Sequence, residues 1–345
     1  MKDKLIWIVV NTCRLLVSAI FIFSGLVKLI DPHGTEYKIQ DYLIAMHLDG
    51  WFNIGFIPLV IAVFLAILEF CLGVYLLFSI RRRTTISLIL LLMVFYTPLT
   101  LWLAISDAVA DCGCFGDAWH LTNWQTFGKN VLVAAMTVPL WFQRRRLTRL
   151  ISEAAQWIIS IAAICGGLLL ASESLYYEPL VDFRPFHVGQ HIPSAMQWTD
   201  NPNEQPEILD FYWEQLPFAA AASSSVPDVE EVLADTSYTF LLTMPHLETS
   251  NDTHMDQINA IYDYACLRGY LFLALTPSDE AAIVRWRDLT GAAYNFAFMD
   301  ELTLKTIARS NPAIVLIHNG TIIGKWGHRQ LPSEEELMEL EASER

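Results

Sequence analysis

Residues 54–80 read IGFIPLVIAVFLAILEFCLGVYLLFSI, and Glu69 is the only charged residue among them. A helix needs about 20 mostly apolar residues to cross the hydrocarbon core of a bilayer. This stretch exceeds that length, and residues 5–30 and 86–105 reach it as well. The three stretches together predict a membrane protein built from α-helices.

Two further stretches are candidate spans. Residues 126–142 are shorter, but Lys129 can extend toward one interface and Trp124 suits the same end. A fifth apolar stretch follows within residues 151–177. We therefore expect a helical bundle of four spans over residues 1–150, followed by a fifth span over residues 151–177.

Composition separates the chain into two halves. Hydrophobic residues make up 54% of the 345 residues, a large share for a single soluble globule. Residues 1–150 carry 13 Lys and Arg against 9 Asp and Glu, whereas residues 151–345 carry 9 against 28. An acidic half repels nucleic acid, so we expect a lipid bilayer and a protein as partners, and no nucleic acid.

Basic residues predict how the spans are oriented. Clusters lie at residues 2–4 before the first span, at 81–83 between the second and third, and at 144–149 between the fourth and fifth. Basic residues in short loops stay in the cytoplasm. The alternate loops, 31–53 and 106–125, then face the opposite side together with the acidic half. We expect a multi-pass protein of the bacterial inner membrane with a cytoplasmic N-terminus and a C-terminal domain in the periplasm, where disulfides persist.

Apolar runs and amphipathic stretches alternate in the acidic half. The runs 238–243 and 270–276 are typical of strands, and the amphipathic stretch 255–268 between them is typical of a helix. Such alternation predicts a layered α/β domain, here over residues 200–345. X-Pro pairs before it favour extended backbone, so we expect residues 178–199 to form a linker.

A short loop between the third and fourth spans carries paired thiols. Residues 111–117 read DCGCFGD. Cys112 and Cys114 can close a small strained disulfide across the flexible Gly113, and strained, exposed disulfides are readily reduced. The two flanking aspartates should raise the pKa of the thiols. The alternatives are a structural disulfide, including one to a cysteine elsewhere, and a pair of metal ligands completed by His120 and a carboxylate. A lone Cys-x-Cys is a weak metal signature, and we assign no metal.

A family resemblance rests on this loop, on residues 23–28 (FSGLVK) and on Glu69. Together they resemble the MauE/DoxX family of redox-associated membrane proteins, over roughly residues 5–145. The resemblance implies a four-helix membrane domain with Cys112 and Cys114 as a redox pair. It also implies thiol oxidation or quinone-coupled electron transfer, which makes a quinone the candidate cofactor.

Two ionisable residues lie inside the predicted spans. Arg14 lies 9 residues after Leu5, and Glu69 lies 11 residues before Ile80. At about 1.5 Å per residue these positions have nearly the same depth. Because charges within a bilayer are costly unless paired, we expect an ion pair between Arg14 and Glu69 that sets the register of two helices.

The α/β domain resembles a thioredoxin that has lost its cysteines. Residues 311–326 read NPAIVLIHNGTIIGKW, in which an Asn-Pro pair precedes two apolar runs joined by the hairpin pair Asn-Gly. The resemblance implies that Pro312 is a cis-proline. The position after the first predicted strand, where an active thioredoxin carries Cys-x-x-Cys, reads MPHLETSN over residues 244–251. We expect Cys266, in the helix that follows, to be a buried small residue.

Two functions fit these observations. In the first, Cys112 and Cys114 exchange electrons with a periplasmic thiol partner docked by the thioredoxin-like domain, and the protein is a component of a thiol/disulfide oxidoreductase. In the second, the protein is a non-enzymatic, membrane-anchored binding or assembly factor whose second domain keeps a fold without its chemistry. The Cys-Gly-Cys loop favours the first function, and the missing Cys-x-x-Cys favours the second.

Overall fold

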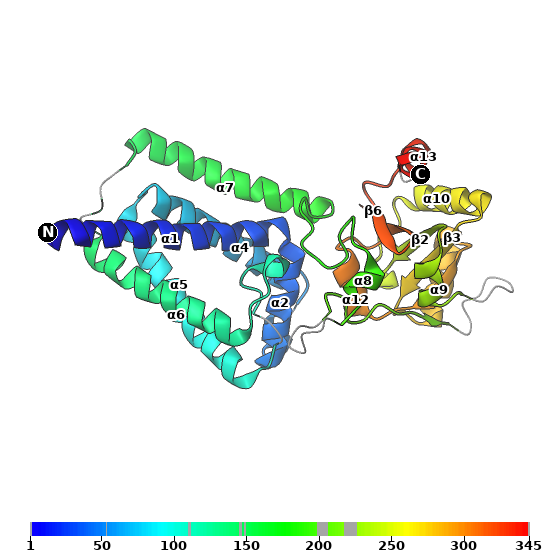
Figure 1. Cartoon of the computed structure of the whole chain (residues 1–345), viewed down its shortest axis with the longest axis horizontal. Coiled ribbons are helices and arrows are strands. Elements are labelled where there is room, and N and C mark those ends of the chain that lie inside the picture. The colour runs from blue at the N-terminus through cyan, green and yellow to red at the C-terminus, as the bar shows by residue number, and fades with distance from the viewer. Residues whose placement is uncertain are drawn as a thin grey trace. The chain divides into compact units, whose positions relative to one another are not determined.

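The computed structural model describes residues 2–52, 54–109, 112–144, 147, 150–198, 206–216 and 226–343. The chain divides into two compact units, Met1–Leu175 and Tyr176–Arg345. The first unit consists of helices and the second is built on a sheet (Figure 1). Asp111 and most of the basic cluster at 144–149 fall outside the described residues.

The first unit is a bundle of long helices joined by shorter ones. Four of the long helices cover the predicted spans within residues 1–150, and a fifth covers the span after them. The elements are α1 (Lys2–Ile30), α2 (Pro32–Ala45), α3 (Asp49–Phe52), α4 (Ile57–Leu77), α5 (Arg82–Ser106), η1 (Gly116–Ala118), α6 (Asn123–Gln143) and α7 (Glu153–Tyr176).

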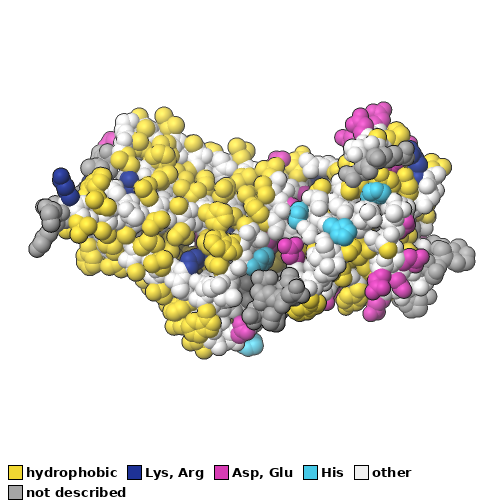
Figure 2. Space-filling view, in the orientation of Figure 1, with side chains coloured by type: hydrophobic (Ala, Val, Ile, Leu, Met, Phe, Trp, Pro, Cys, Tyr) yellow, Lys and Arg dark blue, Asp and Glu magenta, His cyan; other side chains and the backbone are white. Residues whose placement is uncertain are grey.

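Four of these helices, α1, α4, α5 and α7, are long and apolar enough to cross a bilayer. Their outward faces carry large apolar side chains, and Figure 2 shows hydrophobic atoms spread over the surface of this unit. Apolar surface on that scale is stable in contact with lipid rather than water. The helix α6 is not among the four, and it contains the adjacent polar residues Lys129 and Asn130. The chain is therefore a multi-pass membrane protein.

Two glycines bring α1 and α4 into backbone contact. A Cβ atom added to Gly25 would lie 2.4 Å from the backbone nitrogen of Phe70, and one added to Gly73 would lie 2.6 Å from that of Ile22. Small residues at such crossings let membrane helices pack closely. Since Gly25 faces Phe70 and Gly73 faces Ile22, the helices run antiparallel and the turn of α1 that contains Ser24 lies level with Glu69.

The helix α2 occupies a segment that we expected to be a loop, residues 31–53. Asp31 caps it, because its Oδ1 accepts a hydrogen bond from the backbone nitrogen of Gly34 at 2.9 Å. Pro32 takes the first helical position, where its missing N–H costs nothing. An aspartate cap followed by proline is a helix-start signal, and here it marks the helix that covers the Cys-Gly-Cys loop.

The second unit contains a six-stranded sheet with the strand order β1-β4-β3-β2-β5-β6. The pairs β2/β3 and β3/β4 are parallel, whereas β2/β5, β5/β6 and β1/β4 are antiparallel. The predicted hairpin is confirmed, since β5 and β6 pair across Asn319 and Gly320. The elements of the second unit are α8 (Ile192–Ala195), β1 (Glu214–Gln215), α9 (Val229–Ala234), β2 (Tyr238–Thr243), η2 (Leu247–Thr249), α10 (Met255–Arg268), β3 (Leu271–Thr276), α11 (Glu280–Thr290), β4 (Asn295–Phe298), α12 (Glu301–Ile307), β5 (Ala313–His318), β6 (Thr321–Gly327) and α13 (Glu334–Ser343).

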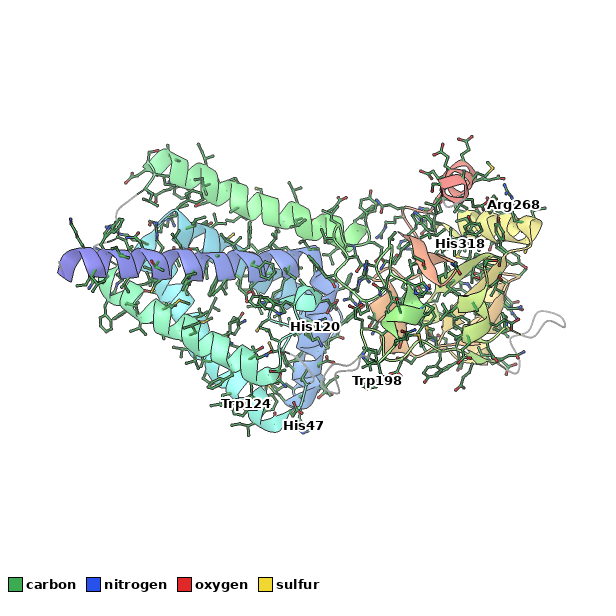
Figure 3. All side chains as sticks on the ribbon, in the orientation of Figure 1. His47, His120, Trp124, Trp198, Arg268 and His318 are labelled. Carbon is green, nitrogen blue, oxygen red and sulfur yellow. The ribbon has the colours of Figure 1, made fainter. Side chains whose placement is uncertain are left out.

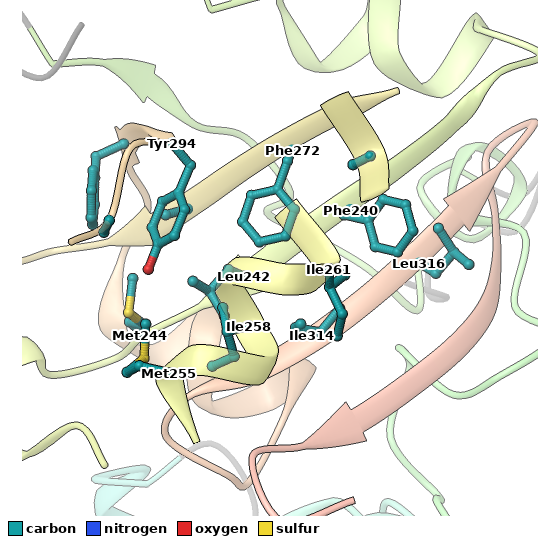
Figure 4. Packing of buried hydrophobic residues seen from close by; sticks show 14 of the residues in the cluster. Phe240, Leu242, Met244, Met255, Ile258, Ile261, Phe272, Tyr294, Ile314 and Leu316 are labelled. Carbon is teal, nitrogen blue, oxygen red and sulfur yellow. The ribbon is translucent and has the colours of Figure 1, made fainter. Parts of the chain in front are cut away.

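Both faces of this sheet are buried, as the continuous burial of β2 indicates. One core contains Phe240 and Leu242 with residues of α10 and α11, and Figure 4 shows Ile258 and Ile261 packed against it. A second core covers the opposite face, where Leu241 meets residues of α9 and α12. The predicted layered α/β architecture is therefore present as a mixed sheet with helices on both faces.

The segment that we expected to be a linker is instead packed into the second unit. Arg184 is 2% exposed, and its Nε and Nη2 lie 2.6 Å from Asp182 Oδ1 and 2.9 Å from Glu178 Oε2. The Glu178 carboxylate also accepts hydrogen bonds from the backbone nitrogens of Arg309 and Ser310. Ile192 is fully buried in the second core. These contacts, rather than the X-Pro pairs, decide the conformation of residues 178–198.

Candidate functional site

The Cys-Gly-Cys loop joins α5 to α6 and is covered by α2. The hydroxyl of Tyr42 donates a hydrogen bond to the carbonyl oxygen of Cys112. Gly113 has a φ of +60°, and a Cβ atom there would lie 2.8 Å from Cγ of Lys38. A glycine is required at this position both by its backbone conformation and by the close approach of α2.

The two cysteines are free thiols in this structure and lie next to each other. The backbone nitrogen of Cys114 is 3.4 Å from Sγ of Cys112, and that Sγ lies 3.2 Å from Oγ1 of Thr126 on α6. Cys112 is only 8% exposed, whereas Cys114 is partly exposed. The pair therefore has one sheltered sulfur and one that is more accessible.

A buried ion pair lies beside this loop within the bundle. Lys28 Nζ on α1 is 2.6 Å from Oε2 of Glu69 on α4, and the two side chains are 11% and 3% exposed. Oγ of Ser24 lies 2.7 Å from the same Oε2 and 2.8 Å from the carbonyl oxygen of Cys114. A hydroxyl has a single proton, so Ser24 donates to one of these two acceptors at a time. This residue links the ion pair to the thiol loop.

A small cavity connects Cys114 to the ion pair. It has a volume of about 30 Å³, enough for one water molecule, and its lining includes Cys114, Lys28 and Glu69. Tyr96 on α5 donates a hydrogen bond of 2.9 Å to Oε1 of Glu69 and lines the same cavity. Lys129 on α6 lines it as well, with Nζ 4.3 Å from the centre of the Phe115 ring. We had expected Lys129 to extend toward the interface, but it contributes to the site.

The two thiols differ in acidity. Cys112 donates a hydrogen bond to the sulfur of Cys114 and is buried, and both effects raise the pKa of Cys112 above its usual range. Accepting that hydrogen bond lowers the pKa of Cys114 to about 6, and the cations of Lys129 and Lys28 act in the same direction. We had expected the flanking aspartates to raise the pKa of both thiols. Asp111 lies outside the described residues, and at Cys114 the neighbouring thiol and two lysines lower the pKa.

This difference predicts the pH dependence of alkylation in the reduced protein. The thiolate is the reactive form, so the alkylation rate of Cys114 by iodoacetamide should rise with pH around a midpoint of about 6. Peptide mapping by mass spectrometry at a series of pH values measures that midpoint. Lys129→Gln should move it upward because a cation is lost, whereas Lys129→Arg should leave it nearly unchanged. A midpoint near 9.0 in the unmodified chain would contradict the assignment.

The ion pair expected between Arg14 and Glu69 is not the one that forms. Glu69 pairs with Lys28, and Nη1 of Arg14 instead lies 3.0 Å from Oγ of Ser79. The expected depths of Arg14 and Glu69 were measured from the ends of the apolar stretches, which were taken to lie level. The contacts at Gly25 and Gly73 decide the actual register of α1 and α4. These contacts place Arg14 about three turns away from Glu69, beyond the reach of an ion pair.

Sequence reasoning missed Lys28 and Ser24 as site residues, although both belong to the quoted string FSGLVK. A usable signal was present: the two residues are four apart and share one face of α1. Tyr96 and Tyr42 carried no comparable signal, since an aromatic residue in an apolar helix is usually a packing residue. His120 lies in the same loop region (Figure 3). Among the described residues no group of three His, Cys, Asp or Glu side chains is placed to hold a metal ion.

In the second unit the peptide bond between Asn311 and Pro312 is cis, the conformation expected at this position. Nδ2 of Asn311 donates to the carbonyl oxygen of His246 at 2.8 Å, which ties the proline loop to the segment after β2. The expectation that Cys266 is buried is wrong, since it is exposed on α10. The second unit thus carries no paired thiols among its described residues.

Comparisons with known proteins bear on the first unit. No curated protein and no solved structure matches the chain significantly. Residues 4–142 match the model of a family described as Methylamine utilisation protein MauE. The matched region contains α1, α4, α5 and α6 together with the Cys-Gly-Cys loop and the Lys28–Glu69 pair. The N-terminal part of this chain, residues 4–142, is thus similar to the family described as Methylamine utilisation protein MauE.

Proposed function

We propose that this protein is a membrane thiol/disulfide oxidoreductase component whose reacting groups are Cys112 and Cys114. The observation that carries the proposal is the adjacency of the two thiols to a buried polar cluster inside a bundle of mostly apolar helices. A structural disulfide needs no lysine, carboxylate and tyrosine beside it. Buried ionisable groups within a membrane domain are costly and are usually functional.

The proposed reaction is a thiol/disulfide exchange followed by reoxidation of the thiol pair. Two thiols of a partner are oxidised to a disulfide while the Cys112–Cys114 disulfide is reduced to two thiols, a transfer of two electrons and two protons. A quinone of the bilayer then accepts both electrons and both protons and becomes a quinol, which restores the disulfide. In the reduced pair Cys114 has the lower pKa and is the more exposed sulfur, so its thiolate is the one that starts reoxidation of the pair.

The second unit is proposed to dock the thiol partner. Its parallel strands β2 and β3 and the antiparallel β5/β6 hairpin support a thioredoxin-like fold. The segment after β2 lies beside the proline loop, as the Asn311 to His246 hydrogen bond shows, but it carries no cysteine. In this proposal the docking surface is on the second unit and the chemistry is on the first.

The orientation forms part of the proposal. The basic residues at 2–4 and 81–83 support a cytoplasmic N-terminus in the bacterial inner membrane. The Cys-Gly-Cys loop and the acidic second unit then both face the periplasm. An oxidising compartment is where a thiol pair of this kind can be kept as a disulfide.

Alkylation of the protein in native membranes, before and after mild reduction, tests the redox state. We expect Cys112 and Cys114 to be protected before reduction and modified after it. Purified protein should also couple oxidation of dithiothreitol to reduction of decylubiquinone, followed by quinol absorbance, and Cys114→Ser should abolish the coupled reaction. Cys266→Ser, which removes an exposed cysteine of the second unit, should leave the rate unchanged.

The alternative is a non-enzymatic assembly factor, favoured by the absence of a cysteine pair near Pro312 in the described residues. If Cys112 and Cys114 are alkylated without prior reduction, and the Cys114→Ser variant behaves as the unmodified chain does in the quinone assay, the redox function is wrong. The assembly function would then replace it.

A further inference from the structure

A second cavity lies at the end of the bundle opposite to the Cys-Gly-Cys loop, where α4 turns into α5. Its volume is about 700 Å³, within the range of roughly 300–1,000 Å³ that small-ligand sites occupy. One wall is formed by α7, through Trp157, Ile161 and Ile164. The cavity shares no lining residue with the one beside Cys114.

The polar end of this cavity is positively charged. Arg81, Arg82 and Arg83 line it, and Glu153 is the one carboxylate among the lining residues. The guanidinium of Arg81 lies 4.7 Å from the centre of the Trp157 ring, which holds it at the cavity wall. The helix α5 begins here with no acidic residue in its first turn, so the positive end of its dipole adds to the positive potential at this end of the cavity.

A buried arginine lies next to the cavity and adds to its positive charge. Arg14 is 8% exposed and donates to Oγ of Ser79, which is itself a lining residue. Its Nε has no hydrogen-bond partner among the described residues. A buried cation without an acceptor for one of its donors is costly, and an anion in the neighbouring cavity would reduce that cost.

We propose that this cavity binds the phosphate headgroup of an anionic phospholipid from the leaflet in which this end of the bundle lies. Arg81 and Arg83 face the headgroup, whereas Arg82 donates a hydrogen bond to the carbonyl oxygen of Leu147. The first methylenes of the acyl chains lie against Ile161, Ile164 and the ring of Tyr75. A lipid fits better than free phosphate because the cavity is amphipathic. Its apolar side is formed by the spans α4 and α7, and its polar side by the turn that joins α4 to α5.

Native mass spectrometry of the purified full-length protein tests the proposal. After delipidation in detergent, the protein is titrated with phosphatidylglycerol, with phosphatidylcholine or with inorganic phosphate. We expect retention of phosphatidylglycerol only. Each arginine near an anionic headgroup contributes on the order of fivefold in affinity, so the double variant Arg81→Gln/Arg83→Gln should weaken retention by roughly 25-fold.

Two further variants separate the cavity from general surface charge. Arg144→Gln removes an arginine that lies over Trp141 and does not line the cavity, so it should leave retention unchanged. Ser160→Phe fills the cavity without changing its charge and should weaken retention although every arginine remains. Equal losses in Arg144→Gln and in the double variant would overturn the proposal. So would equal binding of phosphatidylcholine, or full competition by inorganic phosphate.

Discussion

Lys28→Met is expected to destabilise the helical unit by about 3–5 kcal/mol, because it leaves the Glu69 carboxylate buried without its cation. Glu69 is 3% exposed and retains only hydrogen bonds from Ser24 and Tyr96 after the change. Reversible unfolding in mixed micelles measures the loss of stability. The effect is large because both charges are shielded from water by the bundle.

A double-mutant cycle separates this pair from ordinary packing. The amide of Glu69→Gln can still form hydrogen bonds with Ser24 and Tyr96, but it carries no negative charge. Lys28→Met/Glu69→Gln should therefore be more stable than the sum of the single losses predicts, since no unpaired charge remains. Arg14→Met combined with Glu69→Gln serves as the matched control. Those two changes should add within about 0.3–0.5 kcal/mol, and strong coupling between them would contradict the structure.

Gly25→Ala is expected to cost about 3 kcal/mol, at the upper end of the range for overpacked sites. The added Cβ would lie 2.4 Å from the nitrogen and 2.7 Å from the Cα of Phe70, and a backbone cannot move aside as a side chain can. The helices α1 and α4 must separate instead. Gly73→Ala, at 2.6 Å from the nitrogen of Ile22, should have a similar effect in the same unfolding assay.

The matched controls are glycines in the same bundle that face open space. No atom lies within 4 Å of a Cβ added to Gly128 in α6 or to Gly166 in α7. Alanine at either position should be neutral or slightly stabilising, because alanine favours the helix more than glycine does. A loss of stability at Gly128 as large as that at Gly25 would mean that close helix contact is not the cause.

The contact at Gly25 and the Lys28–Glu69 pair both affect the surroundings of the Cys-Gly-Cys loop. Separation of α1 from α4 would carry Ser24 and Lys28 away from Glu69 and from the carbonyl oxygen of Cys114. Lys28 is one of the cations that hold the pKa of Cys114 down, so Gly25→Ala should also raise the midpoint of the alkylation profile. If Gly25→Ala destabilises the protein without shifting that midpoint, then Lys28 stays close to Cys114 when α1 and α4 separate, contrary to this prediction.

The sequence was sufficient for those features of the fold that depend on local chemistry. The three apolar stretches became α1, α4 and α5 because a bilayer requires a long apolar helix regardless of its neighbours. The β5/β6 hairpin followed from Asn319 and Gly320, which both take positive φ at its turn. The helix α2 was missed although Asp31 and Pro32 marked its start, because its apolar periodicity is weak.

The site was only partly predictable. Cys112 and Cys114 were found because two thiols around a glycine form a local pattern. Lys28 was overlooked as the partner of Glu69, since the estimate of depth assumed that helix ends lie level. The actual register depends on where two backbones approach most closely, at Gly25 and Gly73.

From the sequence alone, several apolar spans within residues 1–177, strands and helices over residues 238–327 and two thiols in one loop could be predicted. These properties depend on composition and spacing along a single segment. The tertiary structure alone decided that Lys28, Glu69 and Tyr96 lie beside Cys114, and that Arg14 is paired with Ser79. The register of packed helices selects the partner of a buried charge, and this register depends on contacts between segments distant in the chain.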